Sequence, residues 1–285
     1  MNRPVIENRT MDEERSLYHL VGTDVKNCIF AGPADGESVL KECRDVTVRD
    51  SRFSLRYPLW HAEGYRLIGS AMDDKTRAPI WYARDGYIEN SEIYGVKCLR
   101  ECDDTRITGS RIVSAEFGWR CRGLSICDSE ITSEYFLFEC RDVMIDRLKM
   151  KGKYSFQYIE NMTIRQSVLD TKDAFWHSRN VTVHDSLVKG EYLGWFSDGL
   201  TLINCHIVGT QPLCYCKNLK LINCTMEDTD LSFEYSDVEA DIRGGILSIK
   251  NPRSGYVLAD TIGETVYEDS IMMSTCRVEV RTSKT

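Results

Sequence analysis

The sequence contains little proline and no long apolar segment. Only 6 of its 285 residues are proline and 19 are glycine, which excludes collagen-like chains and proline-rich disordered chains. No run approaches the roughly 20 apolar residues that a membrane-spanning helix needs. The first residues, MNRPVIENRTMDEER, also lack the apolar core of a signal peptide. We therefore expect a soluble chain that is not exported and lies in the cytoplasm.

Positive charge is also in short supply. The chain has 36 basic residues against 44 acidic ones, a formal net charge of −8 at pH 7. Proteins that bind nucleic acid through their general surface carry an excess of basic residues, usually gathered on one face. We therefore predict neither a nucleic-acid partner nor a membrane partner.

The sequence does contain an internal repeat of 19 residues. Going upstream from the regular part, Ser70, Ser51 and Cys28 continue the series at intervals of 21, 19 and 23 residues, which indicates small loop insertions. The regular part consists of Ser91, Ser110, Ser129, Leu148, Ser167, Ser186, Cys205 and Cys224.

Each repeat has the internal pattern of short strands separated by corners. An apolar pair with one residue between its members precedes the repeated serine, and another apolar residue follows two positions later. A turn-forming residue such as Asp45, Asn161 or Gly199 stands before the pair. A helical repeat would need a longer unit, and crossovers between parallel strands are right-handed as a rule. The pattern predicts an all-β fold, a right-handed single-stranded parallel β-helix of about eleven coils stacked about 4.8 Å apart.

The repeat also predicts how the chain is organised. We expect one structural domain, with the β-helix over residues 1–242 and a capping segment without the repeat over residues 243–285. Residues 13–35 are the expected first coil, although Thr10 and Glu13 also fit the capping box of a short helix. A cap is expected because the open end of a stack exposes unpaired backbone groups.

The 12 cysteines are explained mainly by stacking. In a chain of this size without a signal segment they are expected to be reduced. Four share one column with small residues such as Ala62 and Ala83, and no Cys/His set has tetrahedral metal spacing, so we predict buried, inert thiols, no metal and no cofactor. These four are Cys102, Cys121, Cys140 and Cys216.

All five tryptophans fall in another column. They could form an outward stacking platform or an inward core. The small column two residues further on shares their face, while the column between carries charges, so alternation favours tryptophans inside and charges outside. This phase also buries Arg100 and Gln157, for which the sequence shows no partner. The column consists of Trp60, Trp81, Trp119, Phe138, Trp176, Trp195 and Phe233.

The same phase predicts an outward face rich in rings and polar groups. Tyrosines and histidines on a rigid sheet are typical of carbohydrate-binding surfaces and also of protein interfaces. Between them we expect an exposed apolar row of Leu99, Leu137, Phe156 and Phe175. The predicted ligand-binding residues are His61, Tyr82, Tyr135, Tyr154, Tyr158, His177, Tyr192 and Tyr215.

Glu101, Arg120 and Glu139 stand on consecutive coils of this face. Two coil steps place the carboxylate-bearing backbones about 9.6 Å apart, near the upper end of the range of roughly 6.5 to 9.5 Å found in inverting glycosidases. The three are our candidate catalytic residues. The alternative is an exposed ladder in which the arginine offsets two like charges. His61 and His177 could each act as a base, but they are several coils apart.

Several segments carry a family resemblance that covers about residues 13 to 270. The chain resembles an uncharacterised bacterial family of single-stranded β-helix proteins, known as a domain of unknown function and allied to the pectate-lyase-like superfamily. The resemblance implies the fold and a bacterial origin. The wider superfamily suggests lyases or hydrolases of acidic polysaccharides, but its aspartate clusters have no equivalent here. The segments are GESVLKEC (36–43), RYPLWHAEG (56–64), KDAFWHSRNVTVHDS (172–186), GEYLGWFSDGLTLINC (190–205), PLCYCKNLKLINC (212–224), FEYSDVEADI (233–242) and IKNPRSGYVLADTIGE (249–264).

Two functions are compatible with these patterns. The first is binding of an oligosaccharide or sugar-derived ligand along the outward face; whether Glu101 and Glu139, flanking Arg120, also catalyse hydrolysis, elimination or isomerisation stays open. The second is a non-catalytic scaffold that docks a protein, or a second copy of itself, through the exposed apolar row.

Overall fold

The computed structural model describes residues 3–32 and 36–282. The chain divides into two compact units, Met1–Met144 and Ile145–Thr285, each built from stacked parallel strands. The predicted all-β parallel β-solenoid is confirmed, with about 14 turns in place of about eleven. Extra turns come from both termini. Among the described residues no helix is long enough to cross a membrane.

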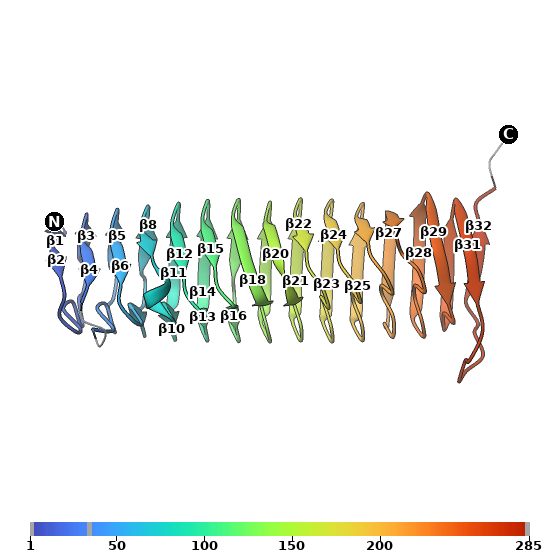
Figure 1. The fold of residues 1–285 in the computed structure, drawn as a ribbon, viewed down its shortest axis with the longest axis horizontal. Coiled ribbons are helices and arrows are strands. Elements are labelled where there is room, and N and C mark those ends of the chain that lie inside the picture. Colours follow the sequence, from blue (N-terminus) through green and yellow to red (C-terminus); the bar gives the residue numbers. More distant parts are fainter. Residues whose placement is uncertain (1–2, 33–35, 283–285) are drawn as a thin grey trace. The chain divides into compact units, whose positions relative to one another are not determined.

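The first unit contains three ladders of parallel strands that lie side by side in chain order (Figure 1). The first ladder is β1 (Val5–Glu7), β3 (Asp24–Lys26), β5 (Thr47–Arg49), β8 (Arg66–Ile68), β11 (Arg84–Glu89), β14 (Asp103–Thr108) and β17 (Ser125–Cys127). The second is β2 (Thr10–Met11), β4 (Ile29–Ala31), β6 (Arg52–Ser54), β9 (Ala71–Met72), β12 (Glu92–Tyr94), β15 (Arg111–Val113) and β18 (Glu130–Phe136). The third is β7 (Leu59–Trp60), β10 (Ile80–Trp81), β13 (Lys97–Arg100), β16 (Glu116–Trp119) and the end of β18.

The solenoid begins earlier than the repeat predicts. Val5 pairs with Asp24 and Thr10 pairs with Ile29, so residues 5–11 already belong to a coil. Thr10 lies in a strand, and the alternative of a helix capped by Thr10 and Glu13 is therefore wrong. Residues 33–35 of the expected first coil lie outside the described residues.

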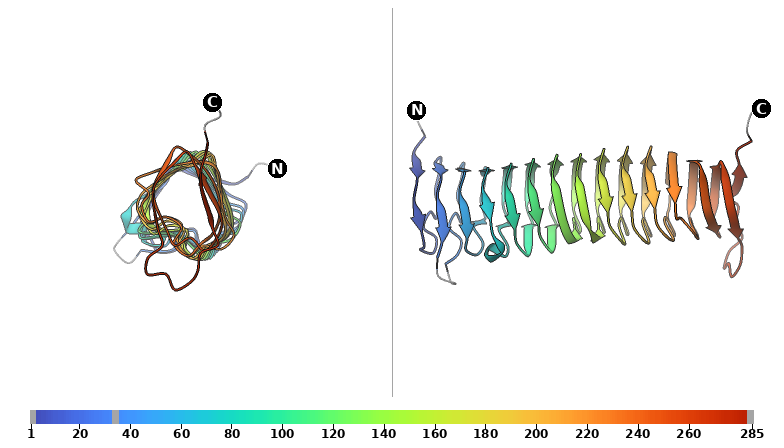
Figure 2. Two further views of the ribbon diagram at one scale, coloured as in Figure 1. Left: turned by 90° about the vertical axis from the view of Figure 1, so that its right-hand side faces the viewer. Right: turned by 45° about the horizontal axis from the view of Figure 1, so that its top comes forward.

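One insertion protrudes from the coils of the first unit. The short 3-10 helix η1 (Asp74–Thr76) lies in the coil whose serines are 21 residues apart, and it bulges out beyond the neighbouring coils (cyan in Figure 2). The predicted loop insertion is thus an ordered segment.

The second unit is built in the same way. Strand β19 (Arg141–Asp146) contains the division between the units. One ladder is β21 (Glu160–Arg165), β23 (Arg179–His184), β25 (Asp198–Ile203), β27 (Leu219–Glu227), β28 (Asp237–Arg243), β30 (Ser254–Ala259) and β32 (Arg277–Val280). The other is β20 (Lys149–Ser155), β22 (Val168–Asp170), β24 (Leu187–Lys189), β26 (His206–Val208) and the end of β27.

Parallel pairing continues after Arg243, where the 19-residue period is lost. Asp237 aligns with Ser254 and Tyr256 aligns with Arg277, which gives offsets of 17 and 21 residues. Strand β29 (Gly245–Lys250) pairs in parallel with β31 (Thr261–Val266) as a separate two-stranded sheet. The expected capping segment therefore contains further coils of changed length.

The repeated serine satisfies backbone groups at a corner. The backbone N–H of Ser51 donates to Oγ of Ser70 (3.1 Å), and the N–H of Ser70 donates to Oγ of Ser91 (3.2 Å). Each hydroxyl in turn donates within its own coil, as Ser51 Oγ does to the carbonyl of Arg49 (2.7 Å). Buried backbone groups need such partners, so the strongest signal in the sequence is structural.

A second corner column requires positive φ. In the second unit it holds Arg147 (φ 51°), Gln166 (φ 47°), Asp185 (φ 50°), Asn204 (φ 52°) and Asn223 (φ 52°). The amide of Asn204 donates to Asp185 (2.9 Å), and the amide of Asn223 donates to Asn204 (2.9 Å). Asn and Asp tolerate this backbone region better than other residues with a side chain.

Gln166 is, with Arg147, one of the two residues of this column in the second unit that are neither Asn nor Asp, and replacing it should stabilise the protein. We expect Gln166→Asn to raise the free energy of unfolding by about 1 kcal/mol, because asparagine reduces the left-handed strain. Chemical denaturation measures the change. Arg165→Asn, at an exposed extended position in β21, is the control. An equal gain at both positions would contradict the explanation from backbone conformation.

The predicted phase of the tryptophan column is wrong in part. The charged column is on the outside and the small cysteine column is buried, as expected. The tryptophans, however, are only half-buried, and the apolar row expected outside is inside, with Leu99, Leu137 and Phe156 at 0 % and Phe175 at 1 % exposure.

Positive φ angles cause the discrepancy. Leu137 (φ 55°) and Glu139 (φ 54°) are both left-handed, and the same holds for Phe175 (φ 62°) and His177 (φ 55°). Side chains alternate between faces only where the backbone is extended. Because the apolar row is buried, the predicted docking surface for a protein or a second copy does not exist.

Candidate functional site

The proposed catalytic residues do form one column. The N–H of Glu101 donates to the carbonyl of Trp119 (2.8 Å), and the N–H of Arg120 donates to that of Phe138 (2.9 Å), so Glu101, Arg120 and Glu139 are in register on successive coils. Arg120 Nε donates to Glu139 Oε2 at 2.8 Å, and both side chains are largely exposed. The two carboxylates raise the pKa of Arg120, with Glu139 the larger influence.

Glu101 belongs to a groove that continues this column toward the N-terminus. The groove has a volume of about 520 Å³ and is open to solvent. Backbone hydrogen bonds of 2.8 to 3.2 Å join the neighbouring coils along its first wall. Four coil steps give this wall a length of about 19 Å. The first wall consists of His19, Glu42, His61, Tyr82 and Glu101.

The second wall is two residues further along each coil. Arg44 pairs with Glu63, Glu63 with Arg84, and Arg84 with Asp103 in parallel register, so charges alternate along the wall. Ala62 and Ala83 lie between the walls and line the bottom of the groove. Small residues at this buried column leave room for a depression between the two charged columns.

Part of the polar lining is fixed by ion pairs. Arg84 Nη2 lies 2.8 Å from Glu63 Oε2, and His19 Nε2 lies 3.0 Å from Glu42 Oε2. The hydrogen bond from Arg84 holds the pKa of Glu63 below its ordinary value, and Glu63 raises the pKa of Arg84. Exposed pairs of this kind add little stability, but they fix the positions of the side chains.

Other polar side chains of the lining have no polar partner among the described residues. Among residues 3–32 and 36–282, the side chains of His61, Tyr82, Glu101 and Asp103 have no hydrogen bond or ion pair within the protein. His61 and Tyr82 stack on each other with ring centroids 5.0 Å apart, and Tyr82 is 42 % exposed. The groove therefore presents unused donors and acceptors on three consecutive coils.

Sequence reasoning found three residues of this groove and missed the others. His61, Tyr82 and Glu101 were predicted. The second wall was not predicted, although the alternating signs of its charges at the repeat interval were a usable signal. The missed residues are His19, Glu42, Arg44, Glu63, Arg84 and Asp103.

The predicted residues Tyr135, Tyr154 and Tyr192 lie outside the groove. Tyr135 and Tyr192 accept the indole N–H of a tryptophan through their backbone carbonyls, at 3.4 Å and 2.7 Å respectively. Tyr154 has Lys153 over its ring at 4.7 Å.

In the second unit, the remaining predicted residues, Tyr158, His177 and Tyr215, form an aromatic ladder together with Phe196, which was not among the predicted ligand-binding residues. Tyr158, His177, Phe196 and Tyr215 stack with centroids 4.8 to 5.0 Å apart and interplanar angles of 7 to 12°. His177 and Phe196 have a ring on both faces, so only their edges meet solvent. Burial and nearby Glu234 raise the pKa of Tyr215 to about 12. A sugar needs an open ring face for stacking, so it cannot stack on His177 or Phe196, whose ring faces are both covered.

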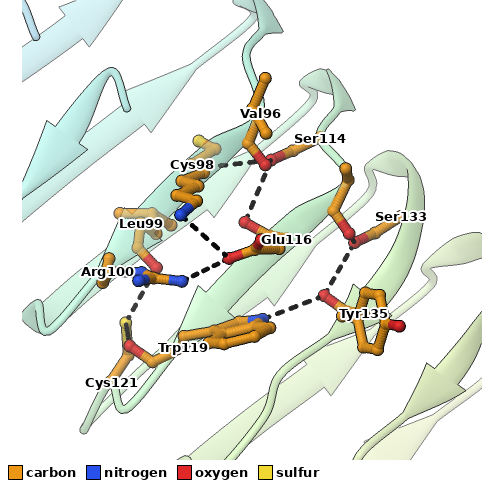
Figure 3. Close-up of polar contacts among 12 residues, drawn as sticks. Val96, Cys98, Leu99, Arg100, Ser114, Glu116, Trp119, Cys121, Ser133 and Tyr135 are labelled. Carbon is orange, nitrogen blue, oxygen red and sulfur yellow. Dashed lines mark hydrogen bonds and ion pairs between the residues drawn. The ribbon is translucent and has the colours of Figure 1, made fainter. Parts of the chain in front are cut away.

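Partners for Arg100 and Gln157 are found in the structure. Arg100 lies over Trp119 (4.6 Å) and Trp81 (5.5 Å) and forms a close ion pair with Glu116, as Figure 3 shows for Trp119 and Glu116. Gln157 donates to the backbone carbonyl of Asp173 at 3.2 Å. The hydrogen-bond acceptors, Glu116 and Asp173, each stand 16 residues later. Trp119, Trp176 and Trp195 also find their carbonyl acceptors at this interval.

Most of the cysteines are buried, but their pKa values do not all shift in one direction. Burial raises the pKa of Cys121, yet hydrogen bonds with Cys102 and Cys140 bring it below its ordinary value, and a hydrogen bond with Cys205 lowers the pKa of Cys224. Cys102, Cys121 and Cys140 are buried and free, as predicted. Burial raises the pKa of Cys43 to about 12 and also raises the pKa of Cys98. Thiols that stay protonated are poor nucleophiles. Among the residues described, no group of three His, Cys, Asp or Glu is placed to hold a metal ion.

Solved structures with related folds were found at low sequence identity. The surface adhesin PfbA of Streptococcus pneumoniae matches at 8 % identity over 84 % of this chain and 82 % of its own, with a TM-score of 0.45. The A-module of the mannuronan C-5 epimerase AlgE6 of Azotobacter vinelandii matches at 12 % identity over 96 % and 87 %, with a TM-score of 0.44.

A catalytic domain of a GH87 α-1,3-glucanase, in complex with tetrasaccharides, matches at 10 % identity over 98 % of this chain and 64 % of its own, with a TM-score of 0.38. A comparison with curated proteins found no match. The family comparison matches residues 4–280, nearly the whole chain. The chain therefore belongs to the family described as "Protein of unknown function (DUF3737)".

Proposed function

We propose that the first unit binds an oligosaccharide in the groove between His19 and Asp103. The observation that carries this proposal is the set of unengaged polar side chains, His61, Tyr82, Glu101 and Asp103, on consecutive coils. Hydroxyl groups of a sugar both donate and accept hydrogen bonds, and these side chains offer both roles. An oligosaccharide consists of similar sugar residues in a row, so it can make similar contacts with the polar groups that the groove presents on consecutive coils.

The charges of the groove favour a neutral or amino-substituted sugar. Four carboxylates line it against two arginines, and Glu101 and Asp103 have no ion-pair partner within 4.0 Å among the described residues. Carboxylates in a shared site repel a further carboxylate and attract an ammonium group. An oligomer of uronic acids is therefore disfavoured.

We expect thermal-shift and calorimetric titrations to show binding. The probes are oligomers of glucosamine, of xylose and of galacturonate. A ligand at a hundredfold excess over its Kd should raise the Tm by about 5 °C, because it binds only the folded state. Preference for galacturonate, or no shift with any probe, would contradict the proposal.

Variants locate the binding. Tyr82→Ala and Glu101→Gln should each weaken binding about tenfold or more, since each removes a hydrogen bond or a charge at the ligand. Arg111→Gln, at an exposed position of strand β15 and outside the groove, is the matched control. Unchanged affinity in both groove variants would rule out this site.

Catalysis by Glu101 and Glu139 is tested with the same ligand. Arg120 already binds Glu139, so Glu139→Gln removes a carboxylate that has a fixed position. If the bound oligomer is converted to product, Glu101→Gln and Glu139→Gln should each abolish conversion while the folded protein remains. Absence of any product from a bound oligomer would leave these residues with a binding role alone.

A further inference from the structure

A smaller cavity of the first unit shares no residue with the groove. Its volume is about 270 Å³, which is enough for a single aromatic ring with one substituent. It is formed where the inserted segment meets the following coil. The lining consists of Tyr57, Arg77, Ala78, Trp81, Val96 and Lys97.

The inserted segment is held firmly against its neighbours. Asp73 caps η1 by accepting the N–H of Lys75 (3.0 Å). Buried Thr76 donates through Oγ1 to the carbonyl of Tyr94 (2.8 Å). The N–H of Lys97 donates to the carbonyl of Arg77 (2.8 Å), which places the two basic residues side by side. Hydrogen bonds within the protein therefore fix this wall of the cavity.

The lining is positively charged in an acidic protein. No carboxylate lines the cavity. Within the described part of the chain Arg77 has no ion pair, and Lys97 Nζ is 4.0 Å from Glu116, which Arg100 approaches more closely. Among these residues Arg77 is thus an unpaired cation, and Lys97 shares the carboxylate of Glu116 with Arg100, so the cavity keeps a positive charge that attracts an anion. A guanidinium can bind a carboxylate through two parallel hydrogen bonds.

The rest of the lining is aromatic and apolar. Tyr57 stacks on Trp60 with centroids 5.0 Å apart, and Trp60 meets Trp81 edge to face at 5.6 Å, so these rings have fixed positions. The indole N–H of Trp81 has no hydrogen-bond partner among the described residues, unlike the indoles of Trp119 and Trp176. The flat rings of Tyr57 and Trp81, together with Ala78 and Val96, can pack against a planar apolar ligand.

We propose that this cavity binds a small aromatic carboxylate. The ring lies among Tyr57, Trp81 and Val96, and the carboxylate meets Arg77 and Lys97. The site is independent of the groove, where carboxylates outnumber arginines and an acid is disfavoured.

The test uses the indole resonances of the five tryptophans. The full-length protein, labelled with ¹⁵N, is titrated with sodium benzoate, and the Trp81 peak is identified as the one missing from Trp81→Phe. We expect a saturable shift of that peak. Benzyl alcohol and benzylamine, which keep the ring but not the anion, should bind about tenfold more weakly or worse, and acetate, which lacks the ring, should bind more weakly as well.

Variants test whether benzoate binds in this cavity and not elsewhere on the protein. Arg77→Gln should weaken benzoate binding about tenfold or more, while Arg111→Gln and the groove variant Glu101→Gln should leave it unchanged. The other tryptophan peaks report whether Arg77→Gln is folded. The proposal is overturned if no peak shift saturates, if benzyl alcohol or acetate binds as tightly as benzoate, or if Arg77→Gln retains full affinity.

Discussion

Phe175→Ala should destabilise the protein by about 3 to 5 kcal/mol, the usual cost of truncating a buried phenylalanine. Phe175 is 1 % exposed and stacks on Phe156 with centroids 4.8 Å apart and an interplanar angle of 11°. Removing the ring leaves a cavity in the interior of the second unit and takes away half of a stacked pair. Chemical denaturation followed by circular dichroism measures the loss.

Phe196→Ala is the matched control for this prediction. Phe196 also stacks on neighbouring rings, but it is 45 % exposed, so its removal should cost about 0.5 to 1.5 kcal/mol. Strict alternation instead places both phenylalanines outside, so that either replacement would be of little consequence. Equal losses for the two variants would show that Phe175 is not in the core.

Gly86→Ala should cost about 3 kcal/mol or more, at the upper end of the penalties for overpacking a core. A Cβ on Gly86 would lie 2.3 Å from Oη of Tyr65, 2.4 Å from its Cζ and 2.6 Å from its Cε1. Tyr65 is 1 % exposed and cannot swing out to solvent. The φ of Gly86 is ordinary, so the cost arises from the collision and not from backbone strain.

A double-mutant cycle identifies the cause. Val46 stands in the same column as Tyr65, one coil earlier, so the backbone there accommodates valine. In a Tyr65→Val background the collision partner is gone, and Gly86→Ala should then cost less than about 1 kcal/mol. Additive losses would mean that Gly86 is required for some other reason.

The candidate site was only partly predictable from the sequence. His61, Tyr82 and Glu101 were identified because their column must face solvent, and the structure places all three in the groove. The second wall was not predicted. A groove forms only if two columns and the small residues between them are suitably spaced across a corner, and the sequence does not show this spacing. The cavity at Arg77 could not be foreseen either. It is formed by an insertion, and inserted residues have no counterpart in the repeat.

The two proposed sites have opposite charge, although they lie in one unit of an acidic protein. In the groove, carboxylates outnumber arginines, whereas the cavity has only Arg77 and Lys97 as charged groups. The net charge of −8 thus gives no guide to either ligand. The local arrangement of charges determines which ligand each site attracts, because interactions between exposed charges are screened beyond about 10 Å at ordinary salt concentrations.

The sequence by itself determined the repeat, the parallel stacking and the columns of residues. Serines at 19-residue intervals suffice for this, since in-register stacking repeats the same hydrogen bond at every coil. Only the tertiary structure decided which columns face inward around the apolar row of Leu99, Leu137, Phe156 and Phe175. Residues with positive φ, such as Leu137 and Phe175, turn their side chains into the core where alternation places them outside. A sequence shows alternation directly, but left-handed backbone at a leucine or phenylalanine is imposed by the stacking of neighbouring coils.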